Sequence, residues 1–421
     1  MSRPVDLLII GAGPAGMAAA LTAAPSGISI AILDDNPLPG GQIWRDGPQA
    51  QLPGQATEMR AQLQRYSNIH LHSACKVVAL AGPKKLLLED AERGYVLEYR
   101  QLILCTGARE LLLPFPGWTL PGVTGAGGLQ ALIKGGLPVS GERIVVAGTG
   151  PLLLASAATA KKNGANVVRV AEQAAFDAVS RFAMGLWQWP NKAVQAVTLA
   201  SRAYRTSAYV LEALGSDRLE AVRVQVGSRI EEMACDRLAC GFSLVPNTEI
   251  GKALGCEIRD SAIAVNEWQA STLADHYAAG ECTGFGGSEL ALVEGRIAGF
   301  AASGQQEKAR ELWPERQRWQ RFAKRLNQAF ALDPAIRKLA KPDTLVCRCE
   351  DVAYAELAEH TSWNAAKLNT RCGMGACQGR ICSTAAHTLF GWEPPHLRPT
   401  FSPARIATLA CLDEAEPSSW S

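Results

Sequence analysis

Six of the twelve cysteines in this chain of 421 residues lie within its last 75 positions. Four of them form a CxC pair and a CxxxxC pair with 27 residues in between, namely Cys347, Cys349, Cys377 and Cys382. Four thiolates so arranged can hold a [2Fe–2S] cluster or a tetrahedral zinc ion, and spacing alone does not separate the two. Cys372 stands between the pairs as a competing ligand. Since no secretory signal precedes these cysteines, their clustering favours metal or redox chemistry over disulfides.

A glycine-rich segment near the start has the pattern of a dinucleotide-binding turn. A short apolar run at residues 6–10, expected to form a buried strand, leads directly into the sequence GAGPAG. An Ala-rich helix is expected at 17–24 and a second strand at 28–33, which ends in Asp34 and Asp35. The order of strand, turn, helix, strand and terminal acid is that of the β-α-β unit that binds dinucleotides, and the first acid is placed to take the ribose hydroxyls.

The residues of this turn have distinct physical roles. Gly11 permits the tight turn, Gly13 lets the backbone approach a pyrophosphate, and Gly16 lets the helix pack against the strand. Pro14 and Ala15 complete the turn ahead of the helix, whose N-terminus offers free N–H groups and a partial positive charge to phosphates. The segment therefore predicts a nucleotide site.

A second strand-turn-helix start, RIVVAGTGPLLL, occurs about 137 residues further along the chain. It carries Gly148 and Gly150 but has Leu153 where a third glycine would stand, and the strand expected at 166–170 ends near Glu172. Two such units imply two nucleotide-type domains in one chain.

Three further pairs of residues accompany the turns. They are Gly41 and Gln42 in a proline-containing loop, Thr106 and Gly107 after a strand expected at 101–105, and Gly280 and Glu281 ahead of a helix expected at 288–303.

Composition and charge narrow the class of protein. A net charge of +2 argues against a nucleic-acid binder, and 48% hydrophobic residues exclude a disordered acidic chain. Residues 7–33 carry no charge, but their glycines and prolines favour a buried strand-helix-strand unit over a membrane span. Residues 305–341 hold ten Lys or Arg and four Asp or Glu, which predicts a solvated linker helix. The alternative is a docking surface, because four aromatic residues interleave the charges: Trp313, Trp319, Phe322 and Phe330.

The order of the motifs GAGPAG, LDD, PGGQ, CTGA, AGTGP and AAGE is similar to that in the two-dinucleotide-domain flavoproteins that include glutathione and thioredoxin reductases. The resemblance covers residues 4–305 and implies FAD in the first domain. It places the first glycine turn under the pyrophosphate, Asp34 on the adenosine ribose, and Glu281 on the ribityl chain or pyrophosphate. The remaining contacts that it implies come from Gly41 and Gln42 beside the flavin and from Thr106 and Gly107 over the nucleotide.

Two departures from that pattern narrow the activity. Residues 41–45 hold no cysteine and the chain has no CxxC, so disulfide reduction is not expected. In the second unit, Leu153 replaces the packing glycine and the following strand ends in Glu172. That site is therefore expected to hold NAD or ATP structurally, or nothing.

The wording around the C-terminal cysteines, VCRCEDV and TRCGMGACQGRIC, resembles the bacterioferritin-associated-ferredoxin type of [2Fe–2S] domain. Relatives of that type lack a cysteine at the place of Cys372, which implies the ligands Cys347, Cys349, Cys377 and Cys382, with a zinc knuckle as the alternative. The other cysteines are expected to be small core hydrophobes. They are Cys75, Cys105, Cys235, Cys240, Cys256, Cys282 and Cys411.

Three longer phrases, ARELLLPFPGWTLPGV, VVAGTGPLLLASA and TRCGMGACQGR, resemble the α subunit of hetero-oligomeric amino-acid dehydrogenases. That group includes the larger subunit of octopine and nopaline oxidases, D-hydroxyproline and L-proline dehydrogenase α subunits, and the middle subunit of hydrogen cyanide synthase. The resemblance implies a β subunit that carries its own FAD, resembles amino-acid oxidases and oxidises the C–N bond, and also a small γ subunit. The α subunit is then expected to accept electrons, with FMN at the subunit interface, and to pass them through [2Fe–2S] to a respiratory acceptor.

A substrate site is not evident in this chain. Its six histidines are scattered, and only His276 falls near a flavin motif, where a capping or core role is favoured over that of a base. We therefore predict no catalytic residue, no nucleic-acid partner, and a cytoplasmic protein that associates peripherally with the membrane through its complex. The rival hypotheses are a stand-alone NAD(P)H-dependent flavin and iron-sulfur reductase, and a non-catalytic iron-handling or assembly module.

The expected fold is α/β, with Rossmann-like FAD and NAD-like domains and a small C-terminal [2Fe–2S] domain. The expected ranges are 1–117 and 240–304 for the FAD domain, 118–239 for the second nucleotide domain, 305–342 for a basic helical connector, 343–412 for the cluster domain and 413–421 for a tail.

Overall fold

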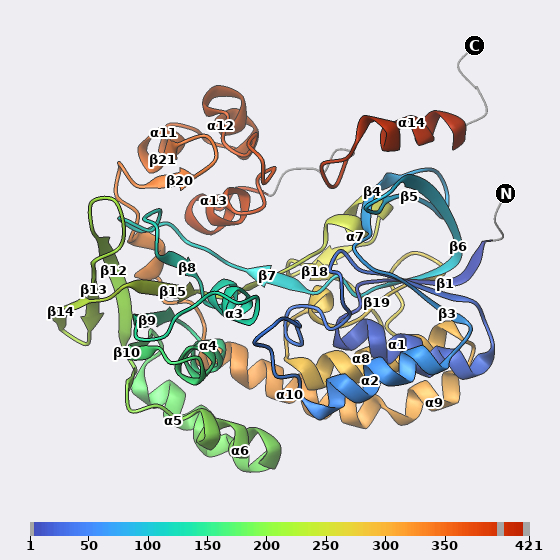
Figure 1. Cartoon of the computed structure of the whole chain (residues 1–421), viewed down its shortest axis with the longest axis horizontal. Coiled ribbons are helices and arrows are strands. Elements are labelled where there is room, and N and C mark those ends of the chain that lie inside the picture. Colours follow the sequence, from blue (N-terminus) through green and yellow to red (C-terminus); the bar gives the residue numbers. More distant parts are fainter. Residues whose placement is uncertain (1–3, 394–399, 416–421) are drawn as a thin grey trace. The chain divides into compact units, whose positions relative to one another are not determined.

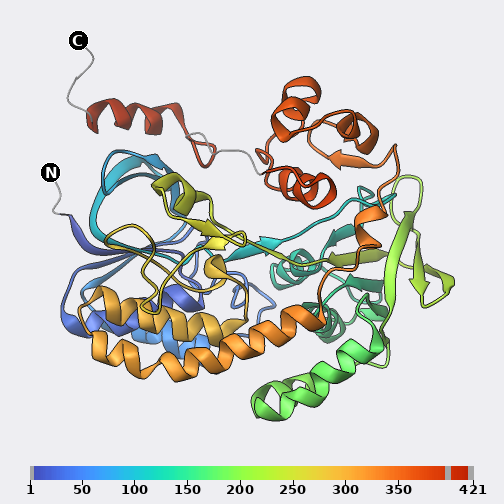
Figure 2. The same cartoon turned by 180° about the vertical axis from the view of Figure 1, so that it is seen from behind.

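The computed structural model describes residues 4–393 and 400–415 and divides the chain into two compact units (Figures 1 and 2). The first unit consists of Met1–Arg109, Pro246–Lys324 and Leu397–Ser421, and the second of Glu110–Val245 and Arg325–His396. Each unit is therefore built from segments that are far apart in the sequence. Residues 416–421 of the predicted tail lie outside the described residues.

A seven-stranded sheet forms the centre of the first unit, in the order β3-β2-β1-β6-β5-β4 with β19 also paired to β6. The strands near the first glycine turn run parallel and are buried on both faces, which explains their continuous apolar sequences. The strands are β1 (Val5–Ile10), β2 (Ile30–Leu33), β3 (Ile69–His72), β4 (Lys76–Leu80), β5 (Lys85–Glu89), β6 (Gly94–Leu104) and β19 (His276–Ala278).

Two helices of the first unit pack with their backbones in close contact. A β-carbon at Gly295 or Gly299 of α8 (Ser288–Ala302) would collide with the backbone of Ala15 or Ala19 in α1 (Pro14–Ala23). This contact fixes the N-terminus of α1 at the carboxyl ends of the parallel strands. The remaining elements here are α2 (Gly54–Arg65), α7 (Glu249–Leu254), α9 (Gln306–Glu311), β17 (Ile258–Arg259) and β18 (Ala262–Ile263).

The second unit contains a five-stranded parallel sheet in the order β11-β10-β9-β15-β8 and a three-stranded antiparallel sheet. The parallel strands are β8 (Val123–Gly125), β9 (Arg143–Gly148), β10 (Asn166–Glu172), β11 (Tyr204–Arg205) and β15 (Arg237–Gly241). The antiparallel strands are β12 (Ala208–Leu214), β13 (Ala221–Val226) and β14 (Arg229–Ala234), while β7 (Ala108–Glu110) pairs with β16 (Leu244–Pro246). The helices are α3 (Ala126–Lys134), α4 (Leu152–Lys162), α5 (Phe176–Gly185) and α6 (Pro190–Leu199).

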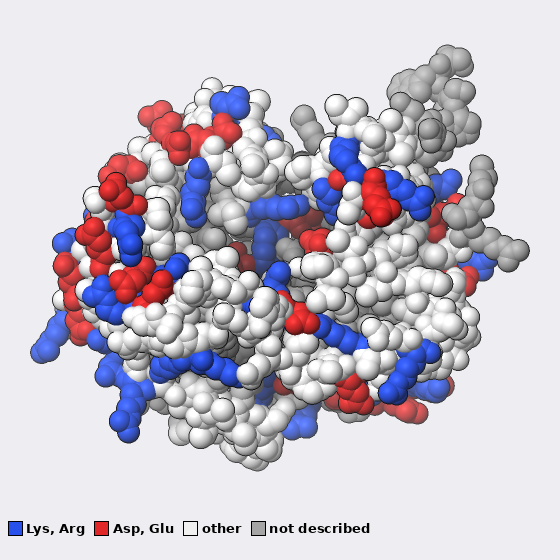
Figure 3. Space-filling view, in the orientation of Figure 1, with Lys and Arg blue, Asp and Glu red and all other residues white. Residues whose placement is uncertain are grey.

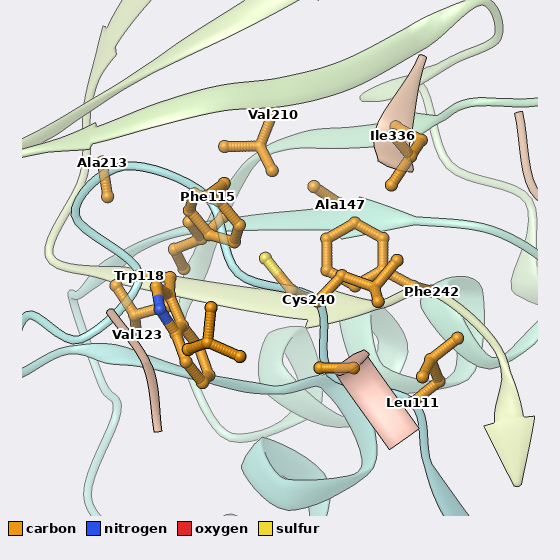
Figure 4. Packing of buried hydrophobic residues seen from close by; sticks show 14 of the residues in the cluster. Leu111, Phe115, Trp118, Val123, Ala147, Val210, Ala213, Cys240, Phe242 and Ile336 are labelled. Carbon is orange, nitrogen blue, oxygen red and sulfur yellow. The ribbon is translucent and has the colours of Figure 1, made fainter. Parts of the chain in front are cut away.

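The cysteine-rich region shares a hydrophobic core with this nucleotide-type domain. Val346 and Trp363 belong to the same buried cluster as Phe115 and Phe242, whose rings meet edge to face at 6.3 Å (Figure 4). The region is made of β20 (Leu345–Cys347), β21 (Val352–Ala353), α11 (Tyr354–Ala358), α12 (Trp363–Thr370) and α13 (Cys382–Phe390).

The basic connector is helical, and its aromatic residues take part in internal packing. In α10 (Trp313–Ala329), Trp319 and Phe322 are buried, and Trp313 meets Trp268 edge to face at 4.8 Å. Phe330, just after α10, packs in the same way on Phe182 at 5.3 Å. These contacts favour the linker interpretation over an aromatic docking surface. Among the described residues, no helix has both the length and the apolar character needed to cross a membrane.

The C-terminal helix α14 (Ile406–Ala415) lies in the first unit, whereas the sequence analysis placed residues up to 412 with the cysteines. A buried carboxylate explains the difference. Glu89 on β5 accepts hydrogen bonds from the Thr408 hydroxyl at 2.6 Å and from the Arg405 backbone at 2.8 Å. The Thr408 hydrogen bond is the main cause that lowers the pKa of Glu89 from 4.5 to about 2.

We expect Thr408→Val, which removes the hydroxyl and keeps the shape, to lower the free energy of unfolding by about 1–2 kcal/mol at pH 7 in urea titrations. Because the folded-state pKa of Glu89 is lowered, this stabilisation is present above pH 4.5 and is lost as the pH falls towards 2. The difference between variant and wild type should shrink over that range. Thr408→Ser keeps the hydroxyl and serves as the control, and equal stability of Thr408→Val and wild type at pH 7 would refute the role of this bond.

Candidate functional site

The first glycine turn lies at the carboxyl ends of β1 and β6. Gly11 has a φ of +103°, and a β-carbon there would collide with the carbonyl of Cys105. A β-carbon at Gly16 would collide with the carbonyl of Gly11. At Gly13, in contrast, the nearest atom to an added β-carbon is the α-carbon of Gly41, 3.9 Å away. The first and third glycines are thus required by packing, while the second leaves room in front of the helix N-terminus.

The acid at the end of β2 supports the turn. One carboxylate oxygen of Asp34 accepts from the Ala12 backbone at 2.6 Å, and the other accepts from the backbone and side-chain amides of Asn36, each at 2.8 Å. Asp34 is buried, while the neighbouring Asp35 is exposed and accepts from Asn36. Asp34 is therefore the acid that the fold brings to the turn.

The loop after β2 folds back onto the turn. The Gly40 backbone donates to the Ala12 carbonyl at 2.8 Å, and Gly41 adopts a φ of +59° beside Gly13. Gln42 is exposed and accepts from Arg45 at 2.8 Å. Of the two residues predicted in this loop, Gly41 lies against the turn and Gln42 faces outward.

Thr106 and Gly107, at the end of β6, are held by Asn247, which the sequence analysis missed. The Asn247 side-chain amide donates to the Thr106 carbonyl at 2.9 Å, and its backbone carbonyl accepts from the Thr106 hydroxyl at 2.6 Å. Its backbone N–H donates to the Gly107 carbonyl at 2.9 Å. No local sequence signal joins residues separated by 141 positions.

The late glycine motif closes the opposite side of the turn. Gly280 has a φ of +80°, and a β-carbon there would lie 2.9 Å from the β-carbon of Ala15. Its backbone N–H donates to the buried carboxylate of Glu294 at 2.9 Å. Glu294 is a second residue that the sequence analysis missed. Burial raises the pKa of Glu294 to about 7 and also raises the pKa of Glu281.

These residues fit the nucleotide end of FAD. The fold supplies a cradle at Gly13 that a side chain would fill and a helix N-terminus without a side-chain cap. Within the described part of the chain, the Glu281 carboxylate makes no hydrogen bond, which leaves an acceptor next to the cradle. When bound, FAD supplies the capacity to accept two electrons as a hydride.

The second glycine turn differs from the first in backbone conformation, because Gly13 has a φ of −72°, and also in its environment. Gly148 and Gly150 have φ values of +140° and +88°, and Leu153 is fully buried where a packing glycine would stand. Glu172 is also fully buried and accepts from the Gly150 backbone at 2.7 Å. Burial raises the pKa of Glu172 to about 7.

Residues 330–333 of the chain lie against this second turn. The Phe330 carbonyl accepts from the Thr149 hydroxyl at 3.1 Å, and the Phe330 side chain lies 4.0 Å from the position of a β-carbon at Gly150. Gln173 donates to the Ala331 carbonyl and accepts from the Asp333 backbone, both at 2.7 Å. The chain itself therefore contacts the loops that follow β9 and β10.

The C-terminal cysteines gather in the second unit. The sulfur atoms of Cys347, Cys372 and Cys382 lie within 4.8 Å of one another, and all three residues are buried. Hydrogen bonds from the Cys372 and Cys382 thiols lower the pKa of Cys347. Cys349 is exposed and lies in hydrogen-bonding contact with the half-buried Cys377. The sulfur-rich donor set fits zinc or an iron-sulfur cluster, because both prefer thiolates.

Trp118 attaches the cysteine region to the second nucleotide-type domain and was not identified from the sequence. Its indole N–H donates to the Leu345 carbonyl at 2.6 Å, and the Arg348 guanidinium lies 5.2 Å from the ring centre. Arg348 stands between the two cysteines of the CxC pair. Trp118 thus helps to position the strand and turn that carry Cys347 and Cys349.

His276 has a hydrogen-bonding partner at each ring nitrogen. Its Nδ1 is 2.7 Å from the Ala274 carbonyl, which requires a proton there, so Nε2 accepts from the Tyr99 hydroxyl at 3.1 Å. The other predicted core cysteines, apart from the half-buried Cys411, are buried as free thiols.

The fold and the first site define a flavoprotein with two dinucleotide-type domains. Residues 5–306 match the pyridine nucleotide-disulphide oxidoreductase family, and the chain belongs to it. The family supports FAD as cofactor, and the chain is a flavin-dependent oxidoreductase.

Curated relatives extend the similarity through the cysteine region. The chain is 32% identical to hydrogen cyanide synthase subunit HcnB of Pseudomonas aeruginosa, covering 95% of this chain and 96% of that protein. It is 30% identical to the A subunit of opine oxidase from Agrobacterium tumefaciens, covering 97% and 92% respectively. These similarities confirm the predicted family of subunits.

Solved structures confirm the Rossmann-like flavoprotein part of the predicted fold. L-Proline dehydrogenase from P. horikoshii aligns with a TM-score of 0.68 at 17% identity, over 97% of this chain and 79% of that one. T. acidophilum thioredoxin reductase aligns with a TM-score of 0.55 at 20% identity, over 73% of this chain and all of that one.

We expect Gly13→Ala to fold normally but to bind FAD at least tenfold more weakly, which corresponds to about 1.4 kcal/mol. The residue has a φ of −72° that any side chain tolerates, and the added methyl group would occupy the approach to the pyrophosphate. Flavin absorbance per chain and titration of the apoprotein measure the effect. Gly54→Ala is the control, because it adds the same atom at a helix start with no atom within 4 Å. Unchanged flavin affinity in Gly13→Ala would contradict this placement.

Proposed function

We propose that this chain is the electron-transfer α subunit of a hetero-oligomeric dehydrogenase or oxidase that acts on the C–N bond of an opine or a cyclic imino acid. The candidate substrates are octopine, nopaline, hydroxyproline and proline. The observation that carries the proposal is the similarity, along nearly the whole chain, to proteins named as subunits of hydrogen cyanide synthase and opine oxidase. A similarity that includes the cysteines supports a shared electron route as well as a shared fold.

The substrate chemistry is assigned to a partner β subunit, an amino-acid-oxidase-like flavoprotein with its own FAD. This division agrees with the first unit, where both ring nitrogens of His276 have partners, the Ala274 carbonyl and the Tyr99 hydroxyl. A small γ subunit, FMN at the subunit interface and a respiratory acceptor complete the proposed complex. Its proposed location is the cytoplasm, with peripheral attachment to the membrane through the complex.

The residues proposed to hold FAD are those at the first turn and around it. The turn contributes Gly11, Gly13, Pro14, Ala15 and Gly16. The surrounding segments contribute Asp34, Asp35, Gly41, Gln42, Thr106, Gly107, Gly280 and Glu281. Of these, the outward-facing Asp35 and Gln42 have the least support from the geometry.

Binding of NAD or ATP at the second turn, by Gly148 and Gly150, is also a proposal. Residues 330–333 contact this turn and Glu172 is fully buried, which speaks against NAD(P)H as the working donor. The geometry therefore favours an electron source on a partner over a stand-alone NAD(P)H-dependent reductase.

Four cysteines are proposed to hold a [2Fe–2S] cluster, which passes electrons one at a time when bound: Cys347, Cys349, Cys377 and Cys382. Each iron of such a cluster needs two thiolates. In support of this set, Cys382 lies beside Cys347, in a group that also contains Cys372, and Cys377 lies beside Cys349. A single zinc ion would instead use the buried group of three, which includes Cys372, and one more ligand.

We expect Cys382→Ser and Cys377→Ser to lose iron and acid-labile sulfide, while Cys372→Ser retains both. Iron, zinc and acid-labile sulfide per chain are the measurements, with electron paramagnetic resonance of the reduced protein as the second readout. Cys235→Ser changes a buried thiol of the same unit and serves as the control. Stoichiometric zinc, or loss of metal from Cys372→Ser with retention in Cys377→Ser, would contradict the proposed ligand set.

We expect the purified chain alone to give no dye-coupled oxidation of octopine, nopaline, proline or hydroxyproline, because the substrate base is assigned to the β subunit. Co-expression with the proposed β subunit, an amino-acid-oxidase-like flavoprotein, should restore oxidation of one of them. Rapid oxidation by the chain alone would overturn the division of labour. Fast anaerobic bleaching of its flavin by NADPH would favour the stand-alone reductase.

A further inference from the structure

The helices α5 and α6 carry an unusual concentration of exposed apolar side chains. Five of the twelve exposed large hydrophobic residues in the described part of the chain fall between positions 176 and 197. We call them the hairpin patch: Phe176, Met184, Trp187, Val194 and Val197, which are 66–77% exposed. The other seven are scattered along the sequence, as is normal for surface hydrophobics.

The patch residues lie on both helices and in the short 3₁₀ turn, Leu186–Gln188, that joins them. Phe176 and Met184 are eight positions apart on α5, and Val194 and Val197 are three apart on α6, so each pair follows one side of its helix. Trp187 lies in the turn between them. Figure 1 shows the two helices in succession at one edge of the second unit. In the same orientation, the surface over them in Figure 3 carries few charged side chains.

The opposite side of the hairpin is already used for packing within the second unit. Leu186 and Trp189 are buried, and the Arg325 guanidinium lies 5.4 Å from the centre of the Trp189 ring. Phe182 meets Phe330 edge to face at 5.3 Å. A surface helix normally has one apolar side and one polar side. The segment is thus anchored through Phe182 and through Leu186 and Trp189 in the turn, whereas no residue of α5 or α6 themselves is buried and the hairpin patch is exposed.

The size of the patch suits a protein interface. Large side chains such as Phe and Trp bury roughly 150–250 Å² each, so five of them at 66–77% exposure present on the order of 500 Å². That is near the upper limit of apolar patches on monomers, and a standard protein interface takes about 800 Å² from each partner. A central Trp with apolar neighbours is also the typical composition of an interface hot spot.

The charges near the patch argue against a membrane surface as its occupant. Between residues 175 and 200 the only ionic side chains are Asp177, Arg181 and Lys192, a net charge of +1. Asp177 and Arg181 pair with each other at 2.8 Å. Interfacial helices that bind anionic lipids carry a polar face rich in Lys and Arg, which this segment lacks.

We infer that the hairpin patch is the surface by which this chain binds the partner flavoprotein of its complex, through an apolar surface on that partner which accepts Trp187. The inference rests on the proposed function, and it adds the place of attachment. The relatives named as subunits supply the reason for choosing a different polypeptide over a second copy of this chain.

The test uses the full chain co-expressed with the tagged β subunit of the proposed function, an amino-acid-oxidase-like flavoprotein. The variant is Trp187→Glu combined with Val197→Glu, and Trp187→Gln is a milder version that carries no charge. Leu368→Glu is the matched control, because Leu368 is 77% exposed, as is Val197, and lies on α12 of the same unit. Flavin content and melting temperature of each isolated chain establish that it is folded.

The wild type and Leu368→Glu should form a stoichiometric complex, whereas the double variant should bind the partner at least tenfold more weakly and retain its flavin. The affinity of Trp187→Gln for the partner should lie between that of the wild type and that of the double variant. The inference is overturned if the double variant binds within twofold of wild type. It is also overturned if the substitutions instead split a dimer of the isolated wild-type chain in sedimentation experiments, or release that chain from phosphatidylcholine and phosphatidylglycerol vesicles.

The outcome also separates this inference from the proposed function. If wild type and double variant form equally active complexes, only the hairpin patch is wrong as the attachment site. If the wild-type chain neither binds the flavoprotein nor supports substrate oxidation with it, the proposed function fails together with the inference.

Discussion

The close approach of three backbone segments at the carboxyl ends of β1 and β6 determines how the first site is built. The carbonyl of Cys105 leaves no space for a side chain at Gly11, and the carbonyl of Gly11 leaves none at Gly16. The helix α1 is held on its other side by the glycines of α8. Because these contacts fix the helix against the sheet, its N-terminus faces the same space as Gly13 and Gly280, where phosphates are favoured.

The two glycine turns of the chain show how similar sequences can serve different purposes. In the first unit the turn is flanked by Gly41 and Gly280, which leave room in front of Gly13. In the second unit a leucine takes the place of the packing glycine, and residues 330–333 contact the turn through Thr149 and Gln173. The first turn is thus built for a ligand, while the second is used at least in part to hold the chain itself.

The cysteine region shares its core with the second nucleotide-type domain, and that shared core has a functional consequence. Its residues pack with Phe115 and Phe242, and Trp118 bonds the strand that leads to Cys347. The cysteine region is too small to bury much apolar surface by itself. Packing on the larger domain increases the surface that it buries and so makes it more rigid. The thiols are therefore carried by a stable support, as a site for a metal or cluster requires.

The sequence by itself determined the order of strands and helices at both turns, the residues of the first turn and the concentration of cysteines near the C-terminus, while the structure showed that the buried group of three includes Cys372. These features depend on local requirements, such as the φ of +103° at Gly11, that only certain residue types satisfy. Only the tertiary structure revealed Asn247, Glu294 and Trp118, the packing of residues 330–333 on the second turn, the place of α14, and the exposed side of α5 and α6. Those depend on partners up to 319 positions away, as for Glu89 and Thr408, and a local pattern of residues carries no record of such distant contacts.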